Sequence, residues 1–299
     1  MPIPESQLET WSHQGASAGS KTTYASVKNA LEAESANYTD RNFTVFLQGS
    51  YGNDTNIFAE SDVDVVICYE GAFYRNLEQL SAEDKAAYLA AHGETASYSY
   101  DLFKGHVEEA LREAFGASVK PGTKAINILA NGARRSADVI PAFNFRRYYR
   151  FKTDSDCAYY EGISFFTSGG KRIDNFPKFH STNATTKHQS ANGNFKPMVR
   201  IFKNMRGRLV DTGALHKGDA PSYFIEGLLY NIPATQFTGT YSNMVYNILK
   251  WLQENPDHTK FVCVNERYYL LRDNDSVCWP IVNGAKFIAA VTKLWNDWE

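Results

Sequence analysis

Cysteine is scarce in this sequence, and its spacing excludes two of its common uses. The 299 residues include 4 cysteines, and no two of them form a Cys-x-x-Cys pair. Closely spaced cysteines are typical of structural zinc sites, and dense sets in short secreted chains are typical of disulfide frameworks. The sequence therefore argues against both. We expect free, mostly buried thiols at Cys68, Cys157, Cys263 and Cys278.

Long apolar runs are also missing. No stretch approaches the roughly 18 consecutive apolar residues that a membrane-spanning helix needs. The first 15 residues, MPIPESQLETWSHQG, lack the basic and apolar regions of a secretory signal peptide. At 43% hydrophobic and 14% aromatic residues, the composition is that of a globular protein with a substantial core. We therefore expect a cytoplasmic protein with no membrane association.

An excess of positive charge is absent as well. The 31 Lys and Arg residues are balanced by 33 Asp and Glu residues, and the net charge is −2. Proteins that grip long nucleic acids usually present a basic stripe to the phosphates. The charge balance therefore argues against long nucleic acid as a partner.

The most informative stretch is Phe46–Ile67, which reads FLQGSYGNDTNIFAESDVDVVI. Asp62 and Asp64 open an apolar run typical of a strand, in which residues two apart share a face. Two neighbouring carboxylates are unfavourable unless a cation lies between them, and Mg²⁺ prefers carboxylate and phosphate oxygens. Gly49 and Ser50 offer a closely approaching backbone and a hydroxyl for phosphates. The stretch therefore predicts a nucleoside triphosphate held through Mg²⁺.

A further carboxylate lies far along the chain. Asn-Gly at 131–132, between two strand-like runs, is typical of a two-residue hairpin turn. The second run, ADVIPAF, contains Asp138, and a lone Asp in an apolar strand is unfavourable for structure alone. One interpretation is that Asp138 caps a turn or pairs with a nearby arginine. The other is that it joins Asp62 and Asp64 as a third metal-binding carboxylate.

The hydrophobic periodicity places mixed strands and helices first and helices last. Strands are predicted at 43–48 and from Asp62 onward, with a hairpin over 163–176. The expected helices are 22–33, 82–93, 102–115, 196–209, 223–230, 242–253 and 285–298. The polar stretch after Pro177 is predicted to be a loop or simple surface. We expect an α+β fold in two lobes, 1–190 and 191–299.

The helix KPMVRIFKNMRGRL carries a basic face. Lys196, Arg200 and Lys203 fall at i, i+4 and i+7, on one side of the helix. The next helix starts near Ser222, in an N-cap-like position. A basic face and a helix start together suit the phosphates of a triphosphate. The same pattern also fits an ordinary solvated basic face.

Together these motifs resemble those of the polymerase-β-type nucleotidyltransferases. More narrowly, the chain resembles the bacterial cGAS/DncV-like nucleotidyltransferases (CD-NTases), and it looks most like their CdnG branch. The resemblance covers residues 43 to 233 and rests on the stretch FLQGSYGNDTNIFAESDVDVVI, then ADVIPAF, NFPKFH, KPMVRIFKNMRGRL and PSYFIEGLLYNIP. It implies a mixed-sheet catalytic lobe with an N-terminal helix over 1–190. A helical lobe over 191–299 would complete a nucleotide cleft that holds the active site.

The resemblance also implies site residues. Asp62, Asp64 and Asp138 match a catalytic triad that binds two Mg²⁺ ions, for which Mn²⁺ can substitute. The residues that match or adjoin the family's nucleotide-binding positions are Gln48, Gly49, Ser50, Lys203 and Ser222. Lys196 and Arg200, neighbours on the same helix, are further candidates for this role. Candidates for contact with the bases are Asn175, His180 and Asn183.

The activity implied by the resemblance is synthesis of a cyclic second messenger. ATP, GTP or both would be joined into a cyclic dinucleotide, such as cyclic GMP–AMP, with release of pyrophosphate. The product would act on an effector protein in defence against phage. Alternatives on the same fold are a linear 2′-5′ or poly(A)-type polymerase and an antibiotic nucleotidyltransferase. A non-enzymatic nucleotide- or RNA-binding module is a further alternative, against which the three adjacent carboxylates argue.

Overall fold

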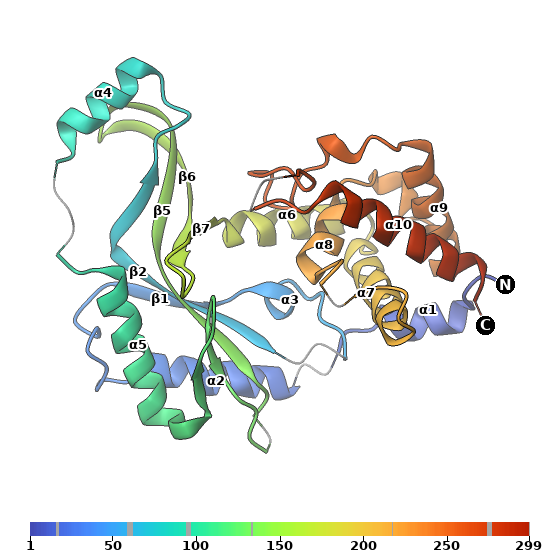
Figure 1. Cartoon of the computed structure of the whole chain (residues 1–299), viewed down its shortest axis with the longest axis horizontal. Coiled ribbons are helices and arrows are strands. Elements are labelled where there is room, and N and C mark those ends of the chain that lie inside the picture. Colours follow the sequence, from blue (N-terminus) through green and yellow to red (C-terminus); the bar gives the residue numbers. More distant parts are fainter. Residues whose placement is uncertain are drawn as a thin grey trace. The chain divides into compact units, whose positions relative to one another are not determined.

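The computed structural model describes residues 1–15, 18–58, 62–93, 97–132, 134–216, 218–273 and 277–298 (Figure 1). The chain forms two compact units, each built from separate segments. The sheet unit comprises residues 18–48 and 62–177. The helical unit comprises residues 1–17, 49–61 and 178–299.

The sheet unit contains a mixed sheet with seven strands among the described residues. Its strands are β1 Phe43–Leu47, β2 Val63–Asn76, β3 Val119–Pro121, β4 Ile126–Ile128, β5 Ala137–Thr153, β6 Asp156–Phe166 and β7 Arg172–Asn175. The order is β1-β2-β5-β4-β3, and β6 pairs with both β5 and β7. β2 and β5 are parallel, while the other pairs are antiparallel. The starts of β2 and β5, which carry Asp64 and Asp138, therefore lie side by side.

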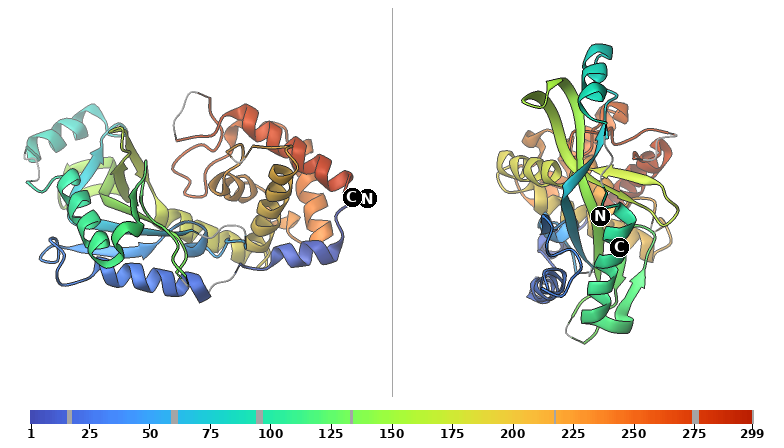
Figure 2. Two further views of the ribbon diagram at one scale, coloured as in Figure 1. Left: turned by 60° about the horizontal axis from the view of Figure 1, so that its bottom comes forward. Right: turned by 90° about the vertical axis from the view of Figure 1, so that its left-hand side faces the viewer.

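Helices cover part of this sheet. They are α2 Ala18–Leu31, α4 Ala82–Ala91 and α5 Tyr100–Phe115, with a short 3₁₀ turn at Gly116–Ser118. α2 and α5 lie side by side and contact β2 and β5 (Figure 2). The aromatic rings of Tyr38, Tyr69 and Phe143 pack around Phe103 of α5, with ring centroids 5.6 to 5.8 Å from it. This aromatic cluster anchors α5 to the sheet.

The helical unit is organised around one central helix. Its helices are α1 Glu5–Ser12, α3 Gly49–Gly52, α6 Pro177–Ser190, α7 Phe195–Asp211, α8 Ser222–Tyr230, α9 Tyr241–Glu254 and α10 Ile281–Asn296. Short 3₁₀ turns lie at Ala234–Gln236 and His258–Lys260. α7 contacts α1, α8, α9 and α10, so it passes through the core of the unit. Fully buried Phe195, Phe202, Phe224 and Phe287 fill the space between these helices.

Most predicted elements are confirmed. The predicted helices at 22–33, 82–93 and 102–115 correspond to α2, α4 and α5, and the hairpin of β6 and β7 is present. β4 and β5 pair antiparallel, as predicted, but β4 ends at Ile128 and β5 begins at Ala137, so their connection is longer than the predicted two residues. Asn131 forms a bridge with Arg134 within this connection. Ser81 caps α4 by accepting a hydrogen bond from the Asp84 amide, and Gly132 has the positive φ of 58° that its turn requires.

The prediction of a loop after Pro177 is wrong, because residues 177–190 form α6. Pro177 takes the first helical position, where its fixed φ suits a helix. The buried positions of α6 include His180 and Ala184. A helix whose buried side is polar or small shows no apolar stripe, so periodicity alone misses it.

The compact units differ from the predicted lobes 1–190 and 191–299. The last division between the units falls between Pro177 and Lys178 rather than at residue 190. The segments 1–17 and 49–61 belong to the helical unit. The cause is packing between distant segments, since α1 contacts α7 and α9.

Two further expectations concern the cysteines and the absence of a membrane-spanning helix. No disulfide joins the cysteines that the structure describes; Cys68 and Cys263 are buried, and Cys157 and Cys278 are partly exposed. Across the part of the chain that the structure describes, no helix combines the length and apolarity that crossing a bilayer requires.

The core of the helical unit makes a stability prediction. Phe224 is fully buried against Phe287, with ring centroids 5.9 Å apart. Phe224→Ala should lower the free energy of unfolding by about 3–5 kcal/mol, because it leaves a cavity. Tyr246→Ala is the control, since Tyr246 on α9 is 54% exposed, and a change within about 0.5 kcal/mol is expected. Urea denaturation measures both, and equal losses in the two variants would contradict this packing.

Candidate active site

Two of the three predicted carboxylates are neighbours in the sheet. β2 and β5 run parallel with Asp64 paired to Asp138, so both side chains leave the sheet on the same face. Asn127 of β4 pairs with Asp138 from the other side, which extends the same row across three strands. Val63, between Asp62 and Asp64 in the sequence, is fully buried on the opposite side. The apolar residues thus fix the register that aligns the polar ones.

Asp62 lies immediately before β2 and is exposed. Its carboxylate accepts a hydrogen bond from the Ser136 hydroxyl, which comes from the residue before β5. The amide of Val63 donates to the Ser136 carbonyl at 3.1 Å, so the starts of both strands are tied together. Asp62 is therefore held at the same edge of the sheet as Asp64 and Asp138.

The electrostatic setting of Asp138 is unusual for an aspartate. Burial raises its pKa above the ordinary value, and the negative charge of Asp62 raises it further. The Asn127 amide donates to Asp138 Oδ1 at 2.5 Å and acts in the opposite direction. The net result is a raised pKa, so Asp138 accepts a proton more readily than an exposed aspartate.

The chemistry of these side chains fits a hard divalent cation, which prefers carboxylate oxygens. Their geometry is not that of gathered ligands: among the described residues, no group of three or more His, Cys, Asp or Glu is arranged to hold an ion. Asp62 and Asp138 instead accept hydrogen bonds from Ser136 and Asn127. Both carboxylates would exchange these donors for an ion.

The predicted phosphate turn follows β1. The amide of Gln48 donates to the Asp64 carbonyl at 3.0 Å, which attaches the start of the turn to β2. Gly49 has a φ of 67°, a conformation that a residue with a side chain rarely adopts. Gly49 and Ser50 open the short helix α3. The side-chain oxygen of Gln48 is buried without a hydrogen-bond partner among the described residues, which suits contact with a ligand.

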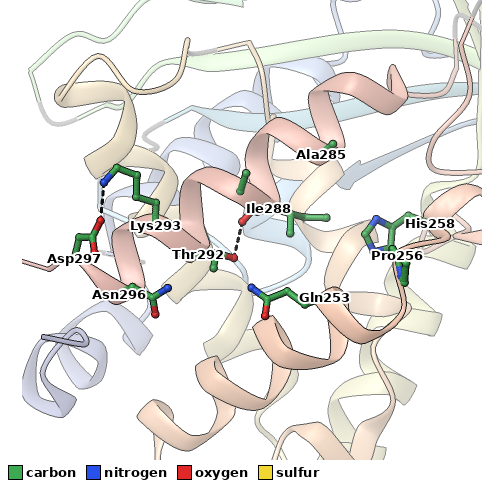
Figure 3. Close-up of a pocket in the computed structure, with 10 residues that line it drawn as sticks. Gln253, Pro256, His258, Ala285, Ile288, Thr292, Lys293, Asn296 and Asp297 are labelled. Atoms are coloured by element: carbon green, nitrogen blue, oxygen red, sulfur yellow. Dashed lines mark hydrogen bonds and ion pairs between the residues drawn. The ribbon is translucent and has the colours of Figure 1, made fainter.

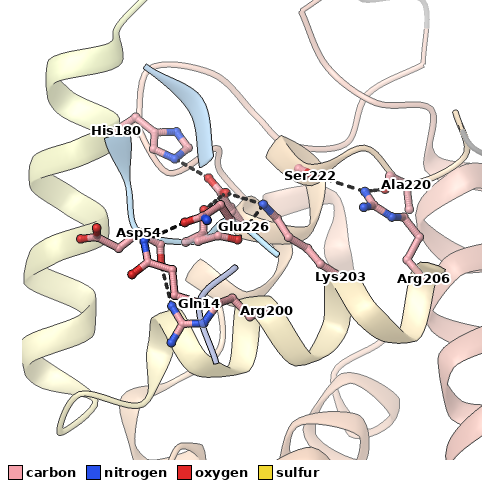
Figure 4. A network of polar contacts seen from close by, with 11 residues as sticks. Gln14, Asp54, His180, Arg200, Lys203, Arg206, Ala220, Ser222 and Glu226 are labelled. Atoms are coloured by element: carbon pink, nitrogen blue, oxygen red, sulfur yellow. Dashed lines mark hydrogen bonds and ion pairs between the residues drawn. The ribbon is translucent and has the colours of Figure 1, made fainter. Parts of the chain in front are cut away.

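The predicted basic face of α7 is not a solvated face. Lys196 Nζ contacts Asp54 Oδ2 at 3.0 Å, and Arg200 donates to the Asp54 carbonyl and to the Ser12 carbonyl. Lys203 is fully buried. Its ammonium donates to the Thr55 carbonyl at 3.0 Å (Figure 4). The basic face therefore packs on the segment that follows α3.

Glu226 of α8 is a residue that sequence reasoning missed. Its buried carboxylate lies 3.3 Å from Lys203 Nζ and 2.8 Å from His180 Nε2 (Figure 4). Glu226 is the charged residue in the apolar run SYFIEGLLY, and this isolated charge could have identified it as a candidate. A buried Glu in an apolar helix needs a cationic partner, and that requirement pointed to α7.

Arg206 is a second residue that was missed. Its guanidinium donates to the Ala220 carbonyl at 3.1 Å and to Ser222 Oγ at 3.2 Å (Figure 4). Ser222 was predicted near the N-cap of this helix. In the structure Pro221 is the N-cap, and Ser222 is the first residue of α8. Arg206 follows Lys203 by three residues, so the helical spacing could have included it in the basic face.

The three candidates for base contact all have partners within the protein. Asn175 Oδ1 accepts from the Phe176 amide, and Asn183 donates to the Val264 carbonyl. His180 contacts Glu226, as described above. Their role in base recognition stays a prediction.

A separate pocket lies between α9 and α10 of the helical unit (Figure 3). Its lining includes Gln253, His258 and Thr292, together with apolar residues such as Ile288. None of the predicted site residues lines it. The pocket therefore gives no support to a ligand site at the residues predicted from the sequence.

Comparison with known proteins identifies the family. Residues 182–296 match the model of the cGAS/DncV-like nucleotidyltransferase C-terminal helical domain. The cyclic nucleotide synthase CdnE01 of Staphylococcus haemolyticus is 38% identical over 304 residues, covering all of both chains. The chain belongs to the cGAS/DncV-like nucleotidyltransferases. It is an enzyme of the cyclic nucleotide synthase type, as the sequence motifs predicted.

Solved structures of this family share the fold. The Rhodothermus marinus CdnE c-UMP-AMP synthase with Apcpp and Upnpp has a TM-score of 0.88 at 36% identity, covering 99% of this chain and 98% of that chain. The Elizabethkingia meningoseptica CdnE cyclic dinucleotide synthase with GTP and Apcpp has a TM-score of 0.78 at 30% identity, covering 98% of each chain. The α+β fold with a C-terminal helical lobe is thereby confirmed.

The predicted CdnG branch is not confirmed. The structure of CdnG from Bradyrhizobium diazoefficiens is 12% identical, with a TM-score of 0.60, which is a likeness of fold alone. The relatives described above carry the name CdnE. The resemblance in motifs reached the family correctly, and the branch stays a prediction.

The raised pKa of Asp138 makes a pH-dependent prediction. A carboxyl that ionises less readily in the folded than in the unfolded state costs stability as pH rises through the folded pKa. Asp138→Asn removes this cost and keeps an acceptor for Asn127, so we expect a higher Tm than wild type at pH 7. The gain should vanish below about pH 4, where aspartate is protonated in either state.

Thermal unfolding at several pH values measures this effect. Asp40→Asn is the matched control, because Asp40 is an exposed aspartate of the same unit. A gain for Asp138→Asn that is the same at pH 4 and pH 7 would contradict the assigned electrostatics.

Proposed function

We propose that this enzyme joins two nucleoside triphosphates into a cyclic dinucleotide and releases pyrophosphate at each of two steps. The observation that carries the proposal is the register of β2 and β5, which sets Asp64 beside Asp138 with Asp62 at the same edge. In each step, a ribose hydroxyl oxygen forms a bond to the α-phosphorus of a triphosphate. The bond between the α and β phosphates breaks, and pyrophosphate takes the electron pair.

The three carboxylates would hold two Mg²⁺ ions, or Mn²⁺ in their place. Bound there, such ions supply charge neutralisation at the phosphates and acidify the attacking hydroxyl. Asp138 would accept the proton of that hydroxyl. Its raised pKa makes it a stronger base than an ordinary aspartate, which favours general base catalysis.

Residues of the helical unit would bind the triphosphate. Gly49 and Ser50 offer backbone and hydroxyl groups, and Ser222 offers a second hydroxyl at the start of α8. The Lys203 ammonium donates to the Thr55 carbonyl, and the Thr55 amide donates to the Ser50 carbonyl of the phosphate turn. Lys196 and Arg200 would add positive charge from the same helix.

ATP is the substrate that we propose first. The R. marinus structure contains Apcpp and Upnpp, and the E. meningoseptica structure contains GTP and Apcpp, so an adenine nucleotide is common to both. The second nucleotide would be GTP, as predicted from the sequence, or UTP, as in the R. marinus relative. The product would activate an effector protein in defence against phage.

Removal of the first two carboxylates tests the catalytic assignment. Asp62→Ala with Asp64→Ala should keep the fold and lower product formation by more than about 10³-fold, because losing even one preorganised electrostatic contact costs about 10²–10³-fold. Asp40→Ala with Asp101→Ala is the control, since both side chains are exposed in the same unit. Chromatography of products in the presence of Mg²⁺ provides the measurement. Near wild-type turnover in the first double variant would sink the assignment.

The identity of the product tests the proposed reaction. ATP is incubated with GTP, UTP or CTP in turn, and the product is treated with phosphatase and mapped by mass and nuclease digestion. We expect one phosphatase-resistant cyclic dinucleotide that contains adenosine. A ladder of phosphatase-sensitive products would instead indicate a linear polymerase, and no pyrophosphate release from any mixture would reject the enzymatic proposal.

A further inference from the structure

One buried cluster of charged groups includes Lys203, a predicted triphosphate residue. Glu226 is only 4% exposed, yet its carboxylate contacts side chains from three different segments (Figure 4). His180 of α6 lies 2.8 Å from Oε2, Lys203 of α7 lies 3.3 Å from Oε1, and the Thr55 hydroxyl donates to Oε1 at 2.5 Å. Glu226 therefore joins α6, α7 and the segment after α3.

The cluster holds Glu226 in its charged form. Burial alone would raise the pKa of Glu226, but the Lys203 ammonium and the bonds from His180 and Thr55 outweigh it and lower the pKa to about 2. A buried ion pair of this kind adds little to stability, because apolar side chains of similar volume usually serve as well or better. The charge at residue 226 therefore calls for a reason beyond stability.

The contacts of Thr55 supply that reason. Its amide donates to the Ser50 carbonyl at 2.9 Å, which attaches Thr55 to the phosphate turn. Its carbonyl accepts from Lys203 Nζ at 3.0 Å, and its hydroxyl donates to Glu226. Thr55 is itself buried, with 1% exposure. One carboxylate thus fixes the lysine directly and the Gly49-Ser50 turn through Thr55.

We propose that Glu226 is a positioning residue for nucleotidyl transfer, which acts through Lys203 and Thr55 without touching the nucleotide. It holds the triphosphate-binding lysine and the phosphate turn in one fixed arrangement. This inference rests on the proposed function, because it assigns a task to residues that bind the triphosphate only if that function holds.

Glu226→Gln tests the inference, since it keeps the shape of the side chain and removes its charge. In the folded variant we expect the KM for ATP to rise about tenfold or more, while kcat changes less, because a charge-assisted contact behind the binding site is lost. The dissociation constant of inorganic tripolyphosphate, measured by calorimetry, should rise by a similar factor. The matched control is Glu5→Gln: Glu5 accepts hydrogen bonds from the Tyr241 and Ser242 amides in the same unit. Glu5→Gln should leave both constants at their wild-type values.

Thr55→Val provides a second variant if Glu226→Gln does not fold. It removes the hydroxyl that bonds to Glu226 and retains the backbone carbonyl that Lys203 contacts. We expect a smaller rise in the same two constants. A folded Glu226→Gln protein with unchanged KM and tripolyphosphate affinity and only a lower Tm would overturn the inference, as would an unchanged Thr55→Val protein. The wild-type protein is assayed before the variants. If it forms no product, the proposed function fails, and this outcome differs from a failure of the inference about Glu226.

Discussion

The parallel pairing of β2 with β5 is the constraint on which the candidate site depends. Paired positions in neighbouring parallel strands point to one face, so a single register aligns Asn127, Asp138 and Asp64 in a row across the sheet. A slip of one residue would turn Asp138 to the opposite face, where Val63 and Val65 are fully buried. The apolar residues between the acids therefore do more than fill the core. The register that buries these apolar side chains also pairs Asp64 with Asp138, so burial of the apolar residues holds the two carboxylates together.

The carboxylates could be predicted from the sequence because their signal is local. The alternation in Asp62-Val63-Asp64, and a single Asp in an otherwise apolar strand, follow from the period of two in a strand. Pairing between the two strands, which are more than 70 residues apart in the chain, had to come from the resemblance to a family or from the structure. The pattern predicted the chemical groups, and the structure showed that Asp64 and Asp138 are paired.

The candidate residues of the helical unit could be predicted only in part. Helical spacing predicted that Lys196, Arg200 and Lys203 share a face, but it did not show what that face contacts. The contacts are Asp54, Thr55 and Glu226, and no short-range pattern links these residues to α7. α6 was missed for a related reason, since its buried residues are a histidine and an alanine rather than an apolar stripe.

The interleaving of segments 1–17 and 49–61 with the C-terminal helices bears on how this protein can be divided. The helical unit is not a module that can be cut from the chain as one piece, although a family model recognises residues 182–296 by themselves. A fragment that began at residue 191 would lack Thr55 and His180, two of the three partners of Glu226. It would also lack α1, which covers α7 and α9. An exchange of C-terminal helices between relatives would therefore have to include the N-terminal helix and the segment after β1. A single crossover in the gene cannot transfer the helical unit, because its three segments are separated in the sequence.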